Sequence, residues 1–109
     1  MGKGHIMVFM TAPNAEEAAR IGRKAVEEGL SACCNIIPGL RSIYRWKGEV
    51  SDEPEVLCLF KTRSELFDRL SGRLKELHSY ETPEVISVNI EGALPAYLAW
   101  IDDSTLKTL

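Results

Sequence analysis

The stretch from Ala32 to Lys61 constrains the fold of this chain more than any other. Two apolar, partly alternating runs meet at Lys47-Gly48, and a two-residue turn ending in glycine between such runs is typical of a β-hairpin. Each limb is at least twice the mean strand length of about 5 to 6 residues, and at roughly 3.3 Å per residue it spans about 45 Å. A domain of about 100 residues has a radius of gyration near 13 Å, so the far end of the hairpin must project beyond its own domain.

Two prolines divide this hairpin into a base and an arm. Counting pairs outward from the turn puts Pro54 opposite Arg41 and Pro38 opposite Leu57. Because proline cannot donate a hydrogen bond to a neighbouring strand, the prolines predict a bulge or bend near mid-length. The base, 32–37 with 56–61, then belongs to the core of the domain, and the arm, 40–55, projects from it.

The arm is too apolar to be left in water. Its apolar side chains are Leu40, Ile43, Tyr44, Trp46 and Val50, and an exposed apolar patch of this kind marks an interaction surface. We expect the arm to pack on another copy of the chain. The alternative is an arm that folds back onto its own sheet.

The other segments complete an alternating order of strands and helices. We expect strands over 6–12 and 85–90, helices over 14–29 and 64–77, and a short helix from 94 to about 101. Asn14, with Glu17 three residues later, predicts a capped helix start, Gly29 a helix end, and Ser64 the cap of the second helix. The resulting fold class is α+β, a ferredoxin-like split β-α-β-β-α-β sandwich with a long central hairpin and a short C-terminal helix.

The expected sheet is apolar on both faces. Leu57 and Leu59 point one way, whereas Cys58 and Phe60 point the other. The two main helices of this fold cover only one face, so the second face requires a partner. The pattern therefore predicts a closed homo-oligomer.

Composition narrows the class of protein. The 109 residues are enough for one domain, 1–109, in which 1–5 are expected to be a tag-derived or disordered extension and 104–109 a frayed tail. A net charge of −3 leaves no basic footprint for nucleic acid, and no apolar run approaches the roughly 18 residues of a membrane span. Three cysteines are an odd number without a secreted pattern, so we expect a cytoplasmic protein without a secretion signal.

The densest polar cluster runs from His78 to Pro83. His78 follows the last apolar helix residue, so it is either a simple C-terminal cation of that helix or a functional group, with Glu81 three residues away. Lys61 falls roughly opposite Cys34, where it could bind an anion or be solvated. A metal site would have to be assembled in space from Cys33, His78, Glu81 or a methionine, and thiolate with imidazole suits copper or zinc. No nucleotide-binding or nucleophile-elbow motif is present.

Several ordered motifs resemble the CutA divalent-cation tolerance proteins. The motifs are Thr11-Ala12-Pro13-Asn14, Ala32-Cys33-Cys34-Asn35-Ile36-Ile37-Pro38-Gly39, Ser42-Ile43-Tyr44-Arg45-Trp46-Lys47-Gly48, Phe60-Lys61-Thr62, His78-Ser79-Tyr80-Glu81-Thr82-Pro83-Glu84 and Tyr97-Leu98-Ala99-Trp100-Ile101. The resemblance runs from Met7 to Ile101. It implies a tight homotrimer akin to the PII signalling proteins, a link to divalent-cation tolerance, copper above all, and Cu(II) binding.

The resemblance also implies a cleft between subunits. Carried over position by position, the cleft residues are Cys33, Lys61, His78, Tyr80, Glu81, Pro83, Tyr44 and Trp46. Two positions depart from the family pattern: Ser79 stands where proline is usual, which is expected to loosen the loop, and Cys34 stands where alanine or an apolar residue is usual.

Three functions follow as hypotheses. The first is a cytosolic homotrimer that binds Cu(II) or another divalent cation through His78, Cys33 and Glu81, with Lys61, Tyr80, Tyr44, Trp46 and Pro83 lining the cleft. The second is a PII-like signalling or interaction platform that senses a small ligand. The third is an enzyme that uses His78 and Glu81 as acid and base, although no catalytic motif specifies a reaction.

Overall fold

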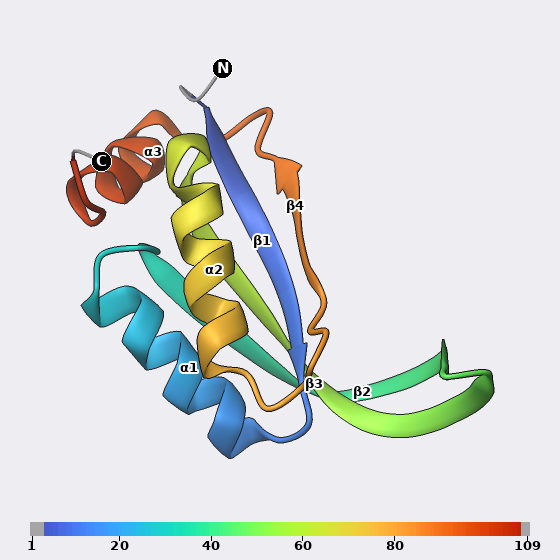
Figure 1. Ribbon diagram of the computed structural model, residues 1–109. Helices are drawn as coiled ribbons and strands as arrows, with labels where there is room; N and C mark the ends of the chain where they lie inside the picture. Colours follow the sequence, from blue (N-terminus) through green and yellow to red (C-terminus); the bar gives the residue numbers. More distant parts are fainter. Residues whose placement is uncertain (1–3, 108–109) are drawn as a thin grey trace.

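The computed structural model describes residues 4–107 and forms two layers (Figure 1). A four-stranded antiparallel sheet has the strand order β2-β3-β1-β4, and two helices lie against one of its faces. The elements are β1 (His5–Ala12), α1 (Ala15–Glu27), β2 (Cys33–Trp46), β3 (Glu49–Arg63), a 3-10 turn (Ser64–Leu66), α2 (Phe67–Leu77), β4 (Val85–Asn89) and α3 (Pro95–Asp103). This confirms the α+β, ferredoxin-like β-α-β-β-α-β order with its short C-terminal helix.

The helix boundaries follow the capping signals in part. The Asn14 side chain accepts a hydrogen bond from the Glu17 N–H at 2.8 Å, and Gly29 adopts a positive φ of 74° just after α1. The carboxylate of Glu17 does not return to the cap but reaches across to the loop after α2. Ser64 begins the 3-10 turn rather than capping α2, which starts at Phe67.

The hydrophobic core lies between the sheet and the two helices. Its largest buried side chains include Met10, Phe60, Ile21, Leu70 and Leu74. The opposite sheet face is also apolar, as expected from the sequence, but α1 and α2 do not cover it. Ile37, Ile86 and Val88 on that face remain 45, 54 and 46% exposed.

The hairpin of β2 and β3 bends where the prolines predicted. Strand pairing runs from Cys33 opposite Lys61 to Trp46 opposite Glu49, with a shift of register between Ile37 and Leu40. Gly39 has φ 88° at the shift, and the residue opposite Arg41 is Pro54. Beyond the bend the arm projects from the body of the domain instead of folding back on the sheet (Figure 1), and the chain extends 43 × 26 × 25 Å.

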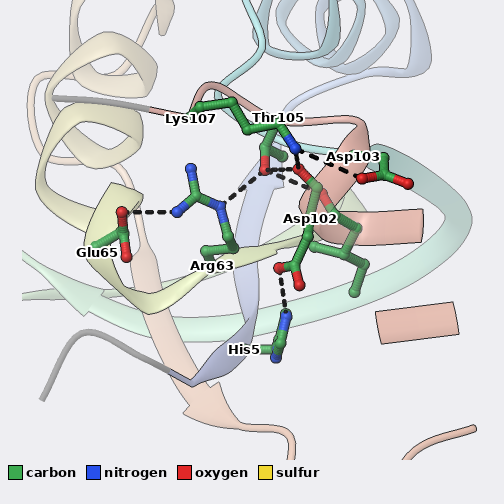
Figure 2. A network of polar contacts seen from close by, with 8 residues as sticks. His5, Arg63, Glu65, Asp102, Asp103, Thr105 and Lys107 are labelled. Atoms are coloured by element: carbon green, nitrogen blue, oxygen red, sulfur yellow. Dashed lines mark hydrogen bonds and ion pairs between the residues drawn. The ribbon is translucent and has the colours of Figure 1, made fainter. Parts of the chain in front are cut away.

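The two ends of the described chain are held together by contacts with α3 and with neighbouring segments (Figure 2). His5 is the first residue of β1, and its Nε2 lies 2.8 Å from Oδ1 of Asp102 in α3. The Arg63 Nε donates to Thr105 Oγ1 at 3.0 Å, and the Leu106 N–H donates to the Gly29 carbonyl at 2.9 Å. His5 and residues 104–107 therefore belong to the packed domain, whereas the other parts of the expected extension and tail, 1–3 and 108–109, lie outside the described residues. Among residues 4–107, no helix is long and apolar enough to cross a membrane.

Candidate functional site

His78 ends α2 and is buried in the loop that follows. Its N–H donates to the Leu74 carbonyl, which makes it the C-cap residue, and its side chain is 0% exposed. Both ring nitrogens are occupied: Nε2 lies 2.7 Å from the Thr11 carbonyl, and Nδ1 accepts the Tyr80 N–H at 3.0 Å. The neutral tautomer with its proton on Nε2 satisfies both contacts. The ring therefore fastens the loop to the end of β1.

Glu17 of α1 fastens the same loop from the helix side. Its carboxylate accepts the Ser79 N–H at 2.8 Å and lies 3.5 Å from the His78 Nδ1. Burial alone would raise the pKa of Glu17. Hydrogen bonds from the Ser79 N–H and hydroxyl outweigh this effect, together with the nearby His78 and Arg20. The pKa of Glu17 is therefore below its ordinary value. Ser79 was expected to loosen the loop where the family has proline. Its N–H, which proline lacks, instead tethers the loop to α1.

Tyr80 connects the loop to the base of the arm. Its hydroxyl donates to Glu55 Oε2 at 2.7 Å, and its ring lies 4.6 Å from the His78 ring. Burial, followed by the hydrogen bond to the Glu55 carboxylate, raises the pKa of Tyr80. Glu55 is only 7% exposed although its side chain ends in a carboxyl group. Sequence reasoning missed Glu55. The available signal was its position: it directly precedes the apolar run that begins at Val56, and its pairing with Leu40 puts its side chain on the same face as the arm aromatics.

A cavity of about 610 Å³ lies between the arm and this loop. Five of the predicted cleft residues line it: Tyr44, Trp46, Tyr80, Glu81 and Pro83. The other lining residues are Thr11, Lys47, Glu55, Thr82 and Glu84. Aromatic and acidic side chains thus come from both walls: Tyr44, Trp46 and Glu55 from the hairpin, and Tyr80, Glu81 and Glu84 from the loop.

Cys33 and Lys61 lie away from this cavity. They pair across β2 and β3, so Lys61 is opposite Cys33 and not Cys34 as expected. The Cys33 Sγ lies 3.8 Å from the Tyr97 hydroxyl, and the Lys61 ammonium donates to the Asn35 side chain. Thr11, which lines the cavity, pairs with Leu57 in the sheet. Lys61 is four positions farther along β3 than Leu57, which is about 13 Å at the usual rise per residue.

Cys34 and Cys58 form a thiol pair on the helix side of the sheet. Cys58 is buried in the core, and Cys34 packs beneath Gly22 of α1. The hydrogen bond with the Cys58 thiol, together with burial, raises the pKa of Cys34. The added thiol at position 34 therefore faces the core and not the candidate site.

Within the described part of a single chain, the proposed metal ligands are not brought together. His78 is enclosed by its own hydrogen bonds, Glu81 lines the cavity, and Cys33 lies next to α3. Across residues 4–107, no group of three histidine, cysteine, aspartate or glutamate side chains is arranged to hold a metal ion. A site made from these three residues would therefore need more than one chain.

The sequence and the fold are both similar to known proteins. The profile of the CutA1 divalent ion tolerance family matches residues 6–104. The chain is 44% identical over 99 residues to the divalent-cation tolerance protein CutA of Thermus thermophilus, which covers 91% of this chain and 96% of that protein. It is 42% identical over 103 residues to the chloroplastic protein CutA 1 of rice, covering 94% of this chain and 58% of the longer plant protein.

Solved structures give the same result. The crystal structure of CutA1 from Oryza sativa superposes with a TM-score of 0.93 at 39% identity, covering 98% of each chain. The divalent cation tolerance protein of Thermus thermophilus superposes with a TM-score of 0.89 at 44% identity, covering 93% of this chain and 98% of that one. The relative from Thermus thermophilus is named as a divalent-cation tolerance protein.

Proposed function

Because the chain belongs to the CutA1 divalent ion tolerance family, we propose that it forms a homotrimer that binds Cu(II), or another divalent cation, in clefts between its subunits. The observation that carries the assembly is the uncovered apolar sheet face. Fully burying one large apolar side chain contributes about 1.5–3 kcal/mol, and Ile37, Ile86 and Val88 are about half exposed in the single chain. A neighbouring subunit on this face would bury them.

The arm supports the same assembly. Ile43 and Val50 are exposed on it, and the arm projects away from the body of the domain (Figure 1). A projecting apolar hairpin is expected to lie on a second copy, and a ring of copies satisfies every arm. The cavity beside the arm would then open at a junction between subunits.

For the cation we propose Cys33 of one subunit and Glu81 of another as ligands. The Cys33 Sγ lies 3.8 Å from the Tyr97 hydroxyl, and Glu81 lines the open cavity. His78 would become a ligand only if Nδ1 exchanged its Tyr80 hydrogen bond for the metal. We therefore propose that His78 positions the loop that carries Glu81. Cysteine has to lose its proton to coordinate, so the affinity should fall as the pH is lowered.

Calorimetric titration of Cu(II) and Zn(II), with the mass measured by light scattering in the same buffer, tests both parts. We expect a mass of three chains and saturable binding that Cys33→Ser and Glu81→Gln each weaken at least about tenfold, equivalent to about 1.4 kcal/mol. Glu91→Gln, an exposed carboxylate in the loop after β4, serves as the control and should change nothing. Binding that survives both ligand substitutions would refute the site, and a monomeric mass would refute the assembly.

The cavity favours a second candidate function, a PII-like platform that senses a small ligand. Its volume of about 610 Å³ lies within the range of about 300–1,000 Å³ that small-molecule sites occupy. This candidate does not require a metal. It predicts that a small molecule stabilises the assembled protein in the absence of any cation.

The location is also part of the proposal. Three free cysteines, one of them buried, are consistent with a reducing cytoplasm. A relative from Archaeoglobus fulgidus is described as periplasmic, and the relatives from rice and Arabidopsis are named chloroplastic. Fractionation of the source cells would decide between these compartments.

A further inference from the structure

We propose that the cavity between the arm and the loop binds the alkylated ammonium group of a small organic cation, with Tyr44 and Trp46 as its aromatic wall and Glu55 as its counter-charge. This inference deepens the small-ligand candidate described above and rests on it. Its contacts differ from those of divalent-cation binding, because they are ring faces and the Glu55 carboxylate and not a set of metal ligands, although Glu81, the proposed metal ligand, lines the same cavity.

The aromatic wall is fixed by strand geometry. Tyr44 and Trp46 are two residues apart on β2, so their side chains point to the same face of the arm. Both rings line the cavity while remaining about 40% exposed, which leaves ring surface accessible to a ligand. Tyr80 contributes a third ring from the loop side. Several rings around one space are the arrangement with which proteins recognise alkylated ammonium groups.

The arm already makes one contact of this kind. The Lys47 ammonium lies 5.6 Å from the centre of the Trp46 ring, within the distance at which a cation is attracted to an aromatic face. A ligand ammonium in the cavity would make the same kind of contact with the Trp46 ring. Lys47 is also the single cation among the cavity residues of the described chain.

The charge of the cavity selects against anions. Glu55, Glu81 and Glu84 line it against Lys47 alone. Glu55 carries the argument because only 7% of its surface is exposed and its Oε2 is held at 2.7 Å by the Tyr80 hydroxyl. A buried carboxylate costs free energy unless it is paired, and one neutral hydroxyl does not neutralise its charge. An organic cation entering the cavity would do so.

The size of the cavity favours an organic cation over a bare metal ion. A space of about 610 Å³ is far larger than the coordination sphere of a divalent ion, whose ligands lie at about 2.0–2.6 Å. The described chain also places no three metal-ligating side chains together there. An ammonium with alkyl substituents would occupy part of this space, with its methyl groups on the rings and its charge near Glu55.

Tryptophan fluorescence gives a direct assay. The chain has two tryptophans, Trp46 and Trp100, so the Trp100→Phe variant reports on Trp46 alone. We would titrate this protein with choline and, separately, with 3,3-dimethylbutan-1-ol, which has the same shape without the charge. We expect a saturable change with choline below about 10 mM and at least about tenfold weaker binding of the neutral alcohol, equivalent to about 1.4 kcal/mol. Equal affinity for the two probes would overturn the proposal.

Matched carboxylate variants test the counter-charge. Glu55→Gln should weaken choline binding at least about tenfold, while Glu53→Gln, on the same strand but outside this cavity, should leave it unchanged. If Glu55→Gln fails to assemble, Trp46→Leu on the exposed arm replaces it, with calorimetry as the readout. The inference would be overturned if choline bound Glu55→Gln, or Trp46→Leu in its place, with unchanged affinity. It would also be overturned if choline did not bind saturably because a neighbouring subunit fills the cavity.

The Cu(II) titration is run in parallel on the same preparations. Loss of choline binding in Glu55→Gln with unchanged Cu(II) binding supports two independent sites. Absence of choline binding in a protein that still binds Cu(II) refutes this inference and leaves the proposed cation function standing. Choline binding in a protein without Cu(II) affinity supports it and refutes the metal site alone.

Discussion

Removing the hydroxyl of Tyr80 should destabilise the protein by an amount that can be worked out from its contacts. The hydroxyl donates to Glu55 Oε2 at 2.7 Å, and Glu55 is buried. A hydrogen bond to a charged group contributes about 1.5–3 kcal/mol, and removing the donor leaves the buried carboxylate without it. We therefore expect Tyr80→Phe to lower the free energy of unfolding by about 2 kcal/mol.

The expected loss is large enough for thermal unfolding to detect. An unfolding entropy of about 2.1 cal/mol/K per residue gives about 0.23 kcal/mol/K for a chain of this length, so about 2 kcal/mol lowers Tm by about 9 °C. Tyr44→Phe is the control, because the structure records no hydrogen bond from the Tyr44 hydroxyl within the described chain. All variants are compared at one protomer concentration, since the proposed assembly would make Tm depend on concentration.

A double-mutant cycle isolates the pair. Glu55→Gln in the Tyr80→Phe background should cost much less than it does alone, with an interaction energy of about 1–2 kcal/mol. The stability that Tyr80 provides should also disappear at high pH, because the pKa of Tyr80 is higher in the folded protein than in the unfolded chain. Its stabilising contribution is complete below the ordinary tyrosine pKa near 10. The contribution is lost as the pH rises through the raised pKa of the folded protein. A Tyr80→Phe loss below about 0.5 kcal/mol, or equal losses in Tyr44→Phe, would refute the reasoning.

The other predictions concern the loop tether and the helix packing. Ser79→Pro removes the N–H that Glu17 binds and should cost about 1 kcal/mol in denaturant unfolding, whereas Ser79→Ala keeps that N–H and should cost less. The pKa of Glu17 is lower in the folded protein than its ordinary value, so its stabilising contribution is present above that ordinary pKa and is lost as the pH falls. Glu17→Gln should therefore reduce the loss of stability that is measured as the pH is lowered into the acid range. Gly22→Ala places a Cβ 2.8 Å from the Cys34 Sγ and should cost about 1–3 kcal/mol, with Cys34→Ala restoring most of it.

The hairpin was predictable because its signals are local. The Lys47-Gly48 turn, the alternation of each limb and two prolines specify the register without tertiary information, and the observed pairing of Arg41 with Pro54 agrees with a count from the turn. The register shift at Pro38-Gly39 means that pairs counted from the turn are wrong by one residue for the part of β2 before Pro38. Lys61 therefore lies opposite Cys33 and not Cys34, and a shift of one residue moves a side chain to the other face of the sheet.

The site was less predictable because its contacts join residues far apart in sequence. The resemblance predicts Tyr44, Trp46, Tyr80, Glu81 and Pro83 as residues of a cleft between subunits, which stays a prediction; in the single chain all five line one cavity. The partners that shape the cavity were not identified. Nothing in the local pattern around Glu17 or Thr11 indicates that they hold a loop more than sixty residues later in the chain. The sequence near the chain ends likewise contains no local signal for the contacts that His5 and Thr105 make with residues far away in the chain.

These long-range contacts make the cavity a property of the whole fold. Residues 78–80 are held by the Thr11 carbonyl at the end of β1, by Glu17 in α1 and by Glu55 in β3, so three elements fix one wall. The opposite wall is the arm, which starts at the bulge next to Glu55 and carries the surface that we propose lies on a neighbouring subunit. Any ligand that contacts both walls therefore binds the folded chain and not the unfolded one, and it must stabilise the folded state by mass action. At one hundred times its Kd, that stabilisation is about 2.7 kcal/mol, so a thermal-shift screen can rank candidate cations even while the natural ligand is unidentified.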